Sequence, residues 1–163
     1  MGKWLMSPKG SGILFVREEH LERLWVNTVS ENWRNYDLKA YRFSHVGTSN
    51  LSVVVGLKAA LDFHQAIGSQ RIYSRIHQLG RKVRDRLREH NQIRILNDEF
   101  HAGLVSFGAV QGDLSRVAAE CDARRIRIRY WPEHKRIRVS THIFTQETEL
   151  NALFDGVERG LRV

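Results

Sequence analysis

The stretch Lys3–Arg17 reads KWLMSPKGSGILFVR, and its second half carries the first signal about the fold. Residues 12–17 form an apolar run directly after a turn that is rich in glycine and serine. Such a run is typical of a strand that is covered on both faces, as in a parallel α/β sheet. We therefore expect an α/β fold whose first element is a buried strand.

Two helical segments follow after an irregular stretch. We expect a short helix at 18–25 and irregular chain at 26–49, where turn-forming residues are frequent. Apolar side chains then recur at steps of three and four, which predicts helices over 51–67 and 69–90. The Gly68–Ser69 pair between them suits a helix end followed by the N-cap of the next helix.

The remaining chain predicts a compact α+β unit in the order β-β-α-β-β-α. Ile126, Ile128 and Tyr130 alternate with arginines, which is the two-residue period of a half-exposed strand. Arg138 alternates in the same way with Ile137 and is expected on the face opposite to it. The predicted elements are strands at 93–96, 103–110, 126–130 and 137–141 and a helix from 113 or 114 to 123. A final helix places the apolar residues from Leu150 to Leu161 inward, with Glu147 and Glu149 near its N-terminus.

The amino-acid composition limits the kinds of ligand and the cellular location that we expect for this chain. The 163 residues contain 26 Lys and Arg against 18 Asp and Glu, a net charge of +8. This excess points to nucleic acid or a small anionic ligand, although solvated helix and strand faces also explain it. No signal peptide is visible, and no apolar run approaches the roughly 18 residues of a membrane span. We expect a cytoplasmic protein with no membrane partner. A single cysteine, Cys121, and the lack of zinc-site spacing predict no internal disulfide and no metal.

Three segments resemble class V aminotransferase-like enzymes, which use pyridoxal 5'-phosphate. KWLMSPKGSGILFVR resembles the family's segment at and after the cofactor lysine. HVGTSNLSVVVGLKAALDFHQAIG, residues 45–68, resembles its Gly-Thr segment and the helix that follows. IRVSTHIFTQETELNAL, residues 137–153, resembles its closing segment. The three matches stand in the family's order and together cover nearly the whole chain.

The resemblance implies a fold and a domain plan. The fold is the C-terminal part of a fold type I transferase that depends on pyridoxal phosphate, with a small α+β C-terminal domain. Residues 1–50 would then be the remnant of the large cofactor-binding domain. Residues 51–90 would be bridging helices, and residues 91–163 would be the small C-terminal domain.

The resemblance also implies roles for four residues. Lys3 matches the lysine whose amine forms the Schiff base with the cofactor aldehyde, a task that needs an amine able to lose its proton near neutrality. Arg138 matches the arginine that grips the substrate α-carboxylate with a planar fork. Gly47 and Thr48 match the pair that reaches into the other subunit's site to hold the cofactor phosphate, which implies a homodimer.

Departures from the family pattern limit what we expect of this chain. Gly2 stands where the family usually has histidine, and nothing before it supplies the family's aspartate for the pyridine nitrogen. We therefore expect the C-terminal remainder of a longer enzyme, inactive alone, with apolar residues 14–16 and 53–57 exposed and prone to association. Residues 126–140 lack the loop cysteine of the desulfurases, and Cys121 is expected to be a buried small hydrophobe.

Two functions follow as hypotheses. The first is an enzyme that acts on the α-carbon of an amino acid by transamination, epimerisation or lyase chemistry, with the nearest resemblance to isopenicillin N epimerase-like proteins. The second is a basic nucleic-acid-binding module, which Tyr130 and Trp131 beside the arginines support. The sequence shows no RNP or helix-turn-helix signature, so we favour the enzyme.

Overall fold

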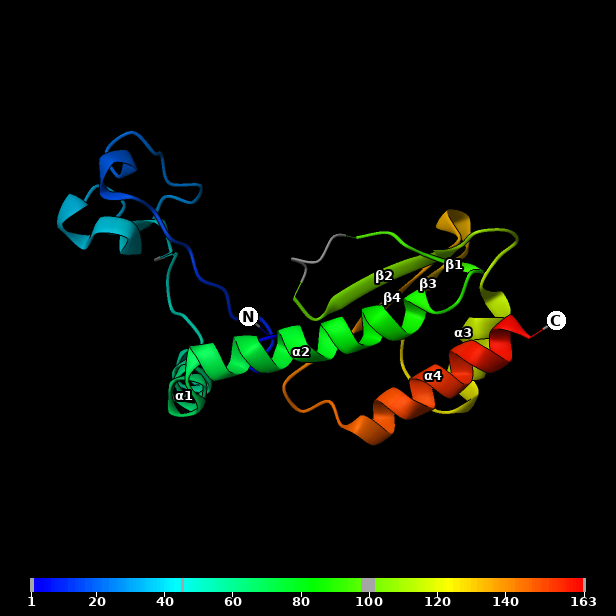
Figure 1. Cartoon of the computed structure of the whole chain (residues 1–163). Helices are drawn as coiled ribbons and strands as arrows, with labels where there is room; N and C mark the ends of the chain where they lie inside the picture. Colours follow the sequence, from blue (N-terminus) through cyan, green and yellow to red (C-terminus); the bar gives the residue numbers. More distant parts are fainter. Residues whose placement is uncertain (1, 45, 98–101, 163) are drawn as a thin grey trace. The chain divides into compact units, whose positions relative to one another are not determined.

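A computed structural model describes residues 2–44, 46–97 and 102–162 (Figure 1). The chain divides into two compact units, Met1–Ala66 and Ile67–Val163. The first unit holds mostly irregular chain and helix α1 (Leu51–Ile67), and the second holds a sheet and three helices. The α/β fold class is therefore correct.

The predicted first strand does not form. Residues 11–17 adopt no regular structure, and a short 3-10 turn, Glu18–His20, follows them in place of the predicted helix. A strand needs a neighbouring strand for its backbone hydrogen bonds. Residues 12–16 make no backbone hydrogen bond to any described residue. The apolar run is therefore irregular chain without a sheet partner.

Arg42 organises the irregular segment that precedes α1. It lies in a 3-10 segment, Tyr36–Phe43, and is only 3% exposed. Its guanidinium donates hydrogen bonds to the carbonyls of Leu21, Leu24 and Trp33. It also lies 4.6 Å from the centroid of the Tyr36 ring. A buried charge that satisfies several carbonyls ties the segment together without regular secondary structure.

The two long helices match the predicted ranges closely. Helix α1 covers Leu51–Ile67 and helix α2 covers Ser69–Arg88. Ser69 was expected as the N-cap of α2, but Gly68 takes that position with a φ of +93°. A glycine tolerates this φ, which leaves Ser69 as the first helical residue.

The second unit has the predicted order of elements. After α2 come β1 (Ile93–Ile95), β2 (Leu104–Ala109), α3 (Ser115–Ala123), β3 (Arg129–Trp131), a 3-10 turn (Pro132–His134), β4 (Arg136–Ser140) and α4 (Glu147–Leu161). The four strands form one antiparallel sheet in the order β1-β2-β4-β3. Helices α2, α3 and α4 lie on one side of this sheet (Figure 1).

The core of the second unit lies between the sheet and these helices. Each strand gives alternate side chains to it, and the helices give their apolar stripes. Fully buried members include Val83 of α2, Phe107 of β2, Val117 of α3, Ile137 of β4 and Val157 of α4. The other face of the sheet carries the intervening side chains, among them Arg138.

Strand β3 begins three residues later than predicted. The N–H of Ile126 donates to the carbonyl of Cys121 at 2.9 Å, and Arg125 has a φ of +58°. Both features close the C-terminus of α3 in the manner of a left-handed helix cap. The first part of the alternating run therefore ends a helix, and only Arg129–Trp131 pairs with β4.

The predicted exposure of apolar residues in the first unit is confirmed in part. Leu14 is 59% exposed and Phe15 is 80% exposed. Val54 and Val55 of α1 are also exposed, while Val16, Val53 and Leu57 are half-buried.

Candidate active site

The turn that carries Lys3 is closed by its own hydrogen bonds. The N–H of Met6 donates to the carbonyl of Lys3 at 3.0 Å. The Ser11 hydroxyl donates to the Pro8 carbonyl at 2.7 Å and lies 2.6 Å from the Ser7 hydroxyl. Lys3 itself is exposed, and its amine has no hydrogen bond or ion pair with a described residue. An ordered turn therefore presents an amine that no carboxylate holds.

Helix α1 supports this turn through two contacts. Trp4 lies against the ring of His64, with 5.3 Å between the ring centroids. Pro8 packs on Gly56, where a Cβ atom would lie 2.4 Å from the proline Cγ. Glycine at position 56 therefore permits the close approach of the helix to the turn. Because Trp4 follows Lys3, these contacts fix the backbone from which the Lys3 amine extends.

Gly47 and Thr48 lie just before the N-terminus of α1. Gly47 has a φ of +131°, which favours glycine, and no atom lies within 4 Å of the place where its Cβ would stand. Thr48 is exposed, and the Asn50 side chain accepts the N–H of Ser52 at 3.1 Å, which caps the helix. An open backbone, a hydroxyl and the positive end of a helix suit a phosphate group. The residues present therefore fit the phosphate of the predicted cofactor.

Arg138 lies in the middle of β4, with a strand on each side. Its register partners are Ser106 of β2 and Arg129 of β3. Ile137 and Val139 are 0% and 6% exposed in the core, so Arg138 extends from the opposite face of the sheet. Its Nε atom is buried and has no hydrogen-bond partner among the described residues. An orphaned guanidinium nitrogen is compatible with the predicted role of binding a carboxylate.

Arg129 and Arg136 lie on the same face of the sheet as Arg138, and all three lie around the Trp131 ring. The guanidinium carbons of Arg136, Arg129 and Arg138 lie 4.7, 5.2 and 5.3 Å from a Trp131 ring centroid. None of the three forms an ion pair with a carboxylate in the described ranges. We call Arg129, Trp131, Arg136 and Arg138 the arginine face. Sequence reasoning identified Arg138 alone, because the cross-strand register that adds Arg129 is a property of the folded sheet.

The predicted site residues belong to both units. Lys3, Gly47 and Thr48 lie in the first unit, and Arg138 lies in the second. Within the first unit, no hydrogen bond between described residues joins Lys3 to Gly47 or Thr48. Their roles therefore remain predictions from the family pattern.

Cys121 is buried, as expected. It lies in α3 with an exposed fraction of 0%, and burial raises the pKa of its thiol to about 11. The Cα and sulfur of Cys121 pack against Gly156 of α4. A protonated, inaccessible thiol is a poor nucleophile.

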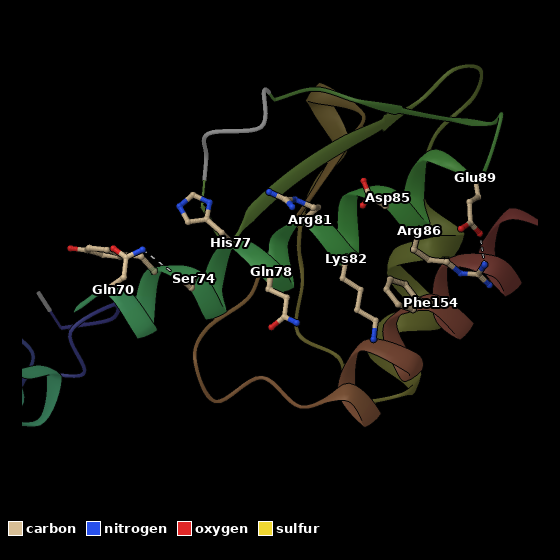
Figure 2. Close-up of a pocket in the computed structure, with 11 residues that line it drawn as sticks. Gln70, Ser74, His77, Gln78, Arg81, Lys82, Asp85, Arg86, Glu89 and Phe154 are labelled. Carbon is tan, nitrogen blue, oxygen red and sulfur yellow. Dashed lines mark hydrogen bonds and ion pairs between the residues drawn. The ribbon is translucent and has the colours of Figure 1, made fainter. Parts of the chain in front are cut away.

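A separate groove of about 940 Å³ runs along α2 and contains none of the predicted site residues. Figure 2 shows its polar lining, from Gln70 at one end to Glu89 at the other. Lys82 pairs with Glu147 of α4, and Arg86 pairs with Glu158 at 2.5 Å. These ion pairs link α2 to α4, so two of the cations in the groove already have partners.

Residues 2–44, 46–97 and 102–162 contain neither a metal site nor a membrane-spanning helix. No three His, Cys, Asp or Glu side chains come together there as a metal site would need. Every helix there is too short or too polar to traverse a bilayer.

Comparison with solved structures supports the predicted fold. The chain resembles the apo cysteine desulfurase of Thermococcus onnurineus NA1 (TM-score 0.78, 24% identity, 95% of this chain and 44% of that one). It also resembles the Escherichia coli cysteine desulfurase CsdA (TM-score 0.76, 22% identity, 96% and 44%). These likenesses confirm the fold of this part of a fold type I transferase.

Related sequences carry the names of cysteine desulfurases. A "Probable cysteine desulfurase" of Streptomyces coelicolor is 30% identical over 181 residues, covering 96% of this chain and 43% of the relative. Another, from Halalkalibacterium halodurans, is 26% identical over 180 residues and covers 97% and 43%. The chain therefore spans less than half the length of these relatives.

The family model for "Aminotransferase class-V" matches residues 2–153, and this range includes Lys3, Gly47, Thr48 and Arg138. The family binds pyridoxal phosphate, and one neighbouring structure, of C-DES, holds glycine covalently linked to its PLP cofactor. The cofactor predicted from the sequence is thus that of the family. With most of its length matched by this model, the chain belongs to the class V aminotransferase family.

Proposed function

We propose that this chain is part of an enzyme that depends on pyridoxal phosphate and acts at the α-carbon of an amino acid. The observation that carries the proposal is the family match over residues 2–153, a range that contains Lys3 and Arg138. The names of the relatives, which are desulfurases and a sulfoxide lyase, favour an enzyme over the nucleic-acid alternative.

In this proposal each predicted residue has a defined task. Thr48 and the Gly47 backbone hold the phosphate at the start of α1. Arg138 binds the α-carboxylate with its fork and so orients the bond that breaks. The Lys3 amine carries the cofactor and moves the α-proton. Pyridoxal phosphate, when bound, supplies the electron-accepting ring that makes this proton removable.

Among the predicted reactions we favour lyase chemistry at a carbon–sulfur bond. One structural neighbour is the cystine C–S lyase C-DES in complex with cysteine persulfide, at 25% identity and a TM-score of 0.74. Cys121 is the one cysteine of this chain, and its buried thiol is not placed to receive sulfur. We propose that Lys3 takes the α-proton and that the electrons of the Cα–H bond form a double bond between Cα and Cβ. The electron pair of the C–S bond leaves with the sulfur on a small product.

The domain plan and the oligomeric state belong to the same proposal. We propose residues 1–50 as part of the large cofactor-binding domain, 51–90 as bridging helices and 91–163 as the small domain. The exposed apolar side chains of the first unit, such as Phe15 and Val55, support further polypeptide against that unit. We propose a homodimer, which light scattering of the purified protein would test.

Borohydride reduction tests the central role of Lys3. The protein is incubated with pyridoxal phosphate and reduced, and the modified peptides are identified by mass spectrometry. We expect Lys3 to be labelled in preference to the other five lysines. Lys3→Ala should remove this label, whereas the matched variant Lys9→Ala, in the same turn, should retain it. Equal labelling of all lysines would refute the proposal.

A further inference from the structure

Three arginines share the face of the sheet on which Arg138 lies. Arg136 is two residues before Arg138 on β4, and Arg129 is its direct register partner on β3. Residues two apart on a strand lie about 7 Å from each other on the same face. Direct partners in an antiparallel pair lie about 5 Å apart. The three guanidinium groups therefore start from neighbouring points on one surface.

The arrangement is unfavourable unless an anion is present. Like charges directly opposite each other on paired strands destabilise a sheet, and Arg129 and Arg138 are such a pair. The nearest acid in the connecting turn, Glu133, lies 4.0 Å from His134. No carboxylate in the described parts of the chain pairs with the three arginines. Local conflicts of this kind in natural proteins occur mainly at functional sites.

Trp131 makes the cluster an ordered one. Its ring lies within 5.3 Å of all three guanidinium carbons, and it is the register partner of Arg136. An aromatic ring beside a guanidinium restricts its motion and excludes water from one of its faces, which strengthens a hydrogen bond to an anion. Arg136 and Arg138 are thereby held as a pair of forks on the same strand.

One carboxylate cannot satisfy these three charges. If Arg138 binds the α-carboxylate, Arg129 and Arg136 remain without a partner beside it. We propose that the arginine face binds a second acidic group, so that the substrate is an amino acid with an anionic side chain. This inference rests on the proposed function, because it assigns the first acidic group to Arg138. Carboxylate, sulfonate and phosphonate share the required chemistry, which is an oxyanion that a guanidinium fork can bind.

Binding of short diacids to the 163-residue chain tests the inference. The probes are succinate, 3-sulfopropionate and 3-phosphonopropionate, with propionate as the singly charged acid, all at one ionic strength. They lack an amine, whose positive charge the arginines would repel. The Trp131 indole N–H resonance, assigned with Trp131→Phe, reports binding. We expect each diacid to bind about tenfold more tightly than propionate, as two charged forks allow. The relative affinities of the three diacids identify the preferred acidic group.

Matched variants test which arginines bind the second acidic group. Arg129→Gln and Arg136→Gln should each remove most of the advantage of the diacids and weaken propionate binding much less. Arg127→Gln removes the same charge from an exposed residue that is not among the three arginines over the Trp131 ring, and it should change neither affinity. Thermal unfolding of each variant controls for loss of fold. Equal binding of propionate and the diacids would overturn the inference, and so would tighter binding of a single-stranded oligonucleotide to this face.

The two proposals fail in different ways. Preference for diacids without selective labelling of Lys3 would refute the proposed function and leave an anion site on the sheet. Selective labelling of Lys3 without preference for diacids would refute the second acidic group alone.

Discussion

Trp4 lies against His64, with 5.3 Å between their ring centroids and 33° between their planes. His64 is 7% exposed, and its buried Nε2 has no hydrogen-bond partner among the described residues. The imidazole ring therefore stabilises the first unit through packing, which holds the turn that carries Lys3 against α1.

This relationship predicts different effects of two substitutions at His64. His64→Phe preserves a ring against Trp4 and should leave the turn in place. His64→Ala removes the ring and should destabilise the first unit by about 1–3 kcal/mol, a typical cost for loss of buried packing. Trp4 fluorescence gives both results, with Trp25, Trp33 and Trp131 replaced by Phe. Its maximum shows whether the turn stays in place, and its change during urea denaturation gives the free energy of unfolding. His77→Ala, at an exposed histidine, is the control. If His64→Phe proved as damaging as His64→Ala, the imidazole nitrogens would be essential and the packing argument wrong.

Gly160 predicts how closely α3 and α4 must pack. A Cβ at this position would lie 2.4 Å from the Cα of Val117 and 2.6 Å from its nitrogen. These are backbone atoms, so the two helices would have to separate. Gly160→Ala should lower the free energy of unfolding by about 1–3 kcal/mol, measured by urea denaturation. Asn151→Ala, at an exposed position of the same helix, should change it by less than about 0.5 kcal/mol. Wild-type stability of the Gly160 variant would show that the helices are further apart.

Much of the second unit could be predicted from the sequence, because its signals are local. The apolar stripe of α2 and the alternation around Ile137 each report directly on one buried face. The strand expected at residues 12–17 failed for the opposite reason. An apolar run indicates that its side chains tend to be buried. A strand also needs a hydrogen-bonding neighbour, and residues 12–16 have none in the described chain.

Only the part of the candidate site that lies in contiguous sequence motifs could be predicted. Lys3, Gly47, Thr48 and Arg138 were identified from family motifs, which are contiguous in sequence. Arg129 was not, since it joins Arg138 only through strand register. Arg136 was not either, although its position two residues before Arg138 puts both on one face of β4. The signal that could have found them is the run of arginines on both sides of the turn at 132–135.

Cys121 predicts a pH dependence of stability. Burial raises the pKa of its thiol from 9.0 to about 11 in the folded protein. Well below pH 9 the thiol is protonated in both states and contributes no pH dependence. As the pH rises from about 9 to 11, the unfolded state loses its proton first, so folding becomes less favourable.

Unfolding midpoints from pH 8 to 11 measure this effect, with Cys121→Ala as the control that lacks the thiol. The wild type should lose more stability than the control over this range. At pH 8 a thiol reagent should react slowly with the native protein and rapidly with the unfolded chain. Fast reaction of the native protein would show an accessible thiol, and would reopen Cys121 as a sulfur acceptor.

Substitution of Arg138 should weaken anion binding without lowering the stability of the fold. If it binds the α-carboxylate, Arg138→Gln should weaken propionate binding by about 1.5–3 kcal/mol, the range for a hydrogen bond to a charged group. Arg138→Lys keeps the charge and loses the planar fork, so its affinity should fall between those of the wild type and the Gln variant. The same Gln substitution removes the cross-strand repulsion with Arg129, so the unfolding temperature should stay constant or rise. Titration of the Trp131 indole resonance and thermal unfolding give the two quantities on the same samples. A Gln variant that unfolds more easily while it retains propionate binding would mean that Arg138 supports the sheet and that the carboxylate binds elsewhere.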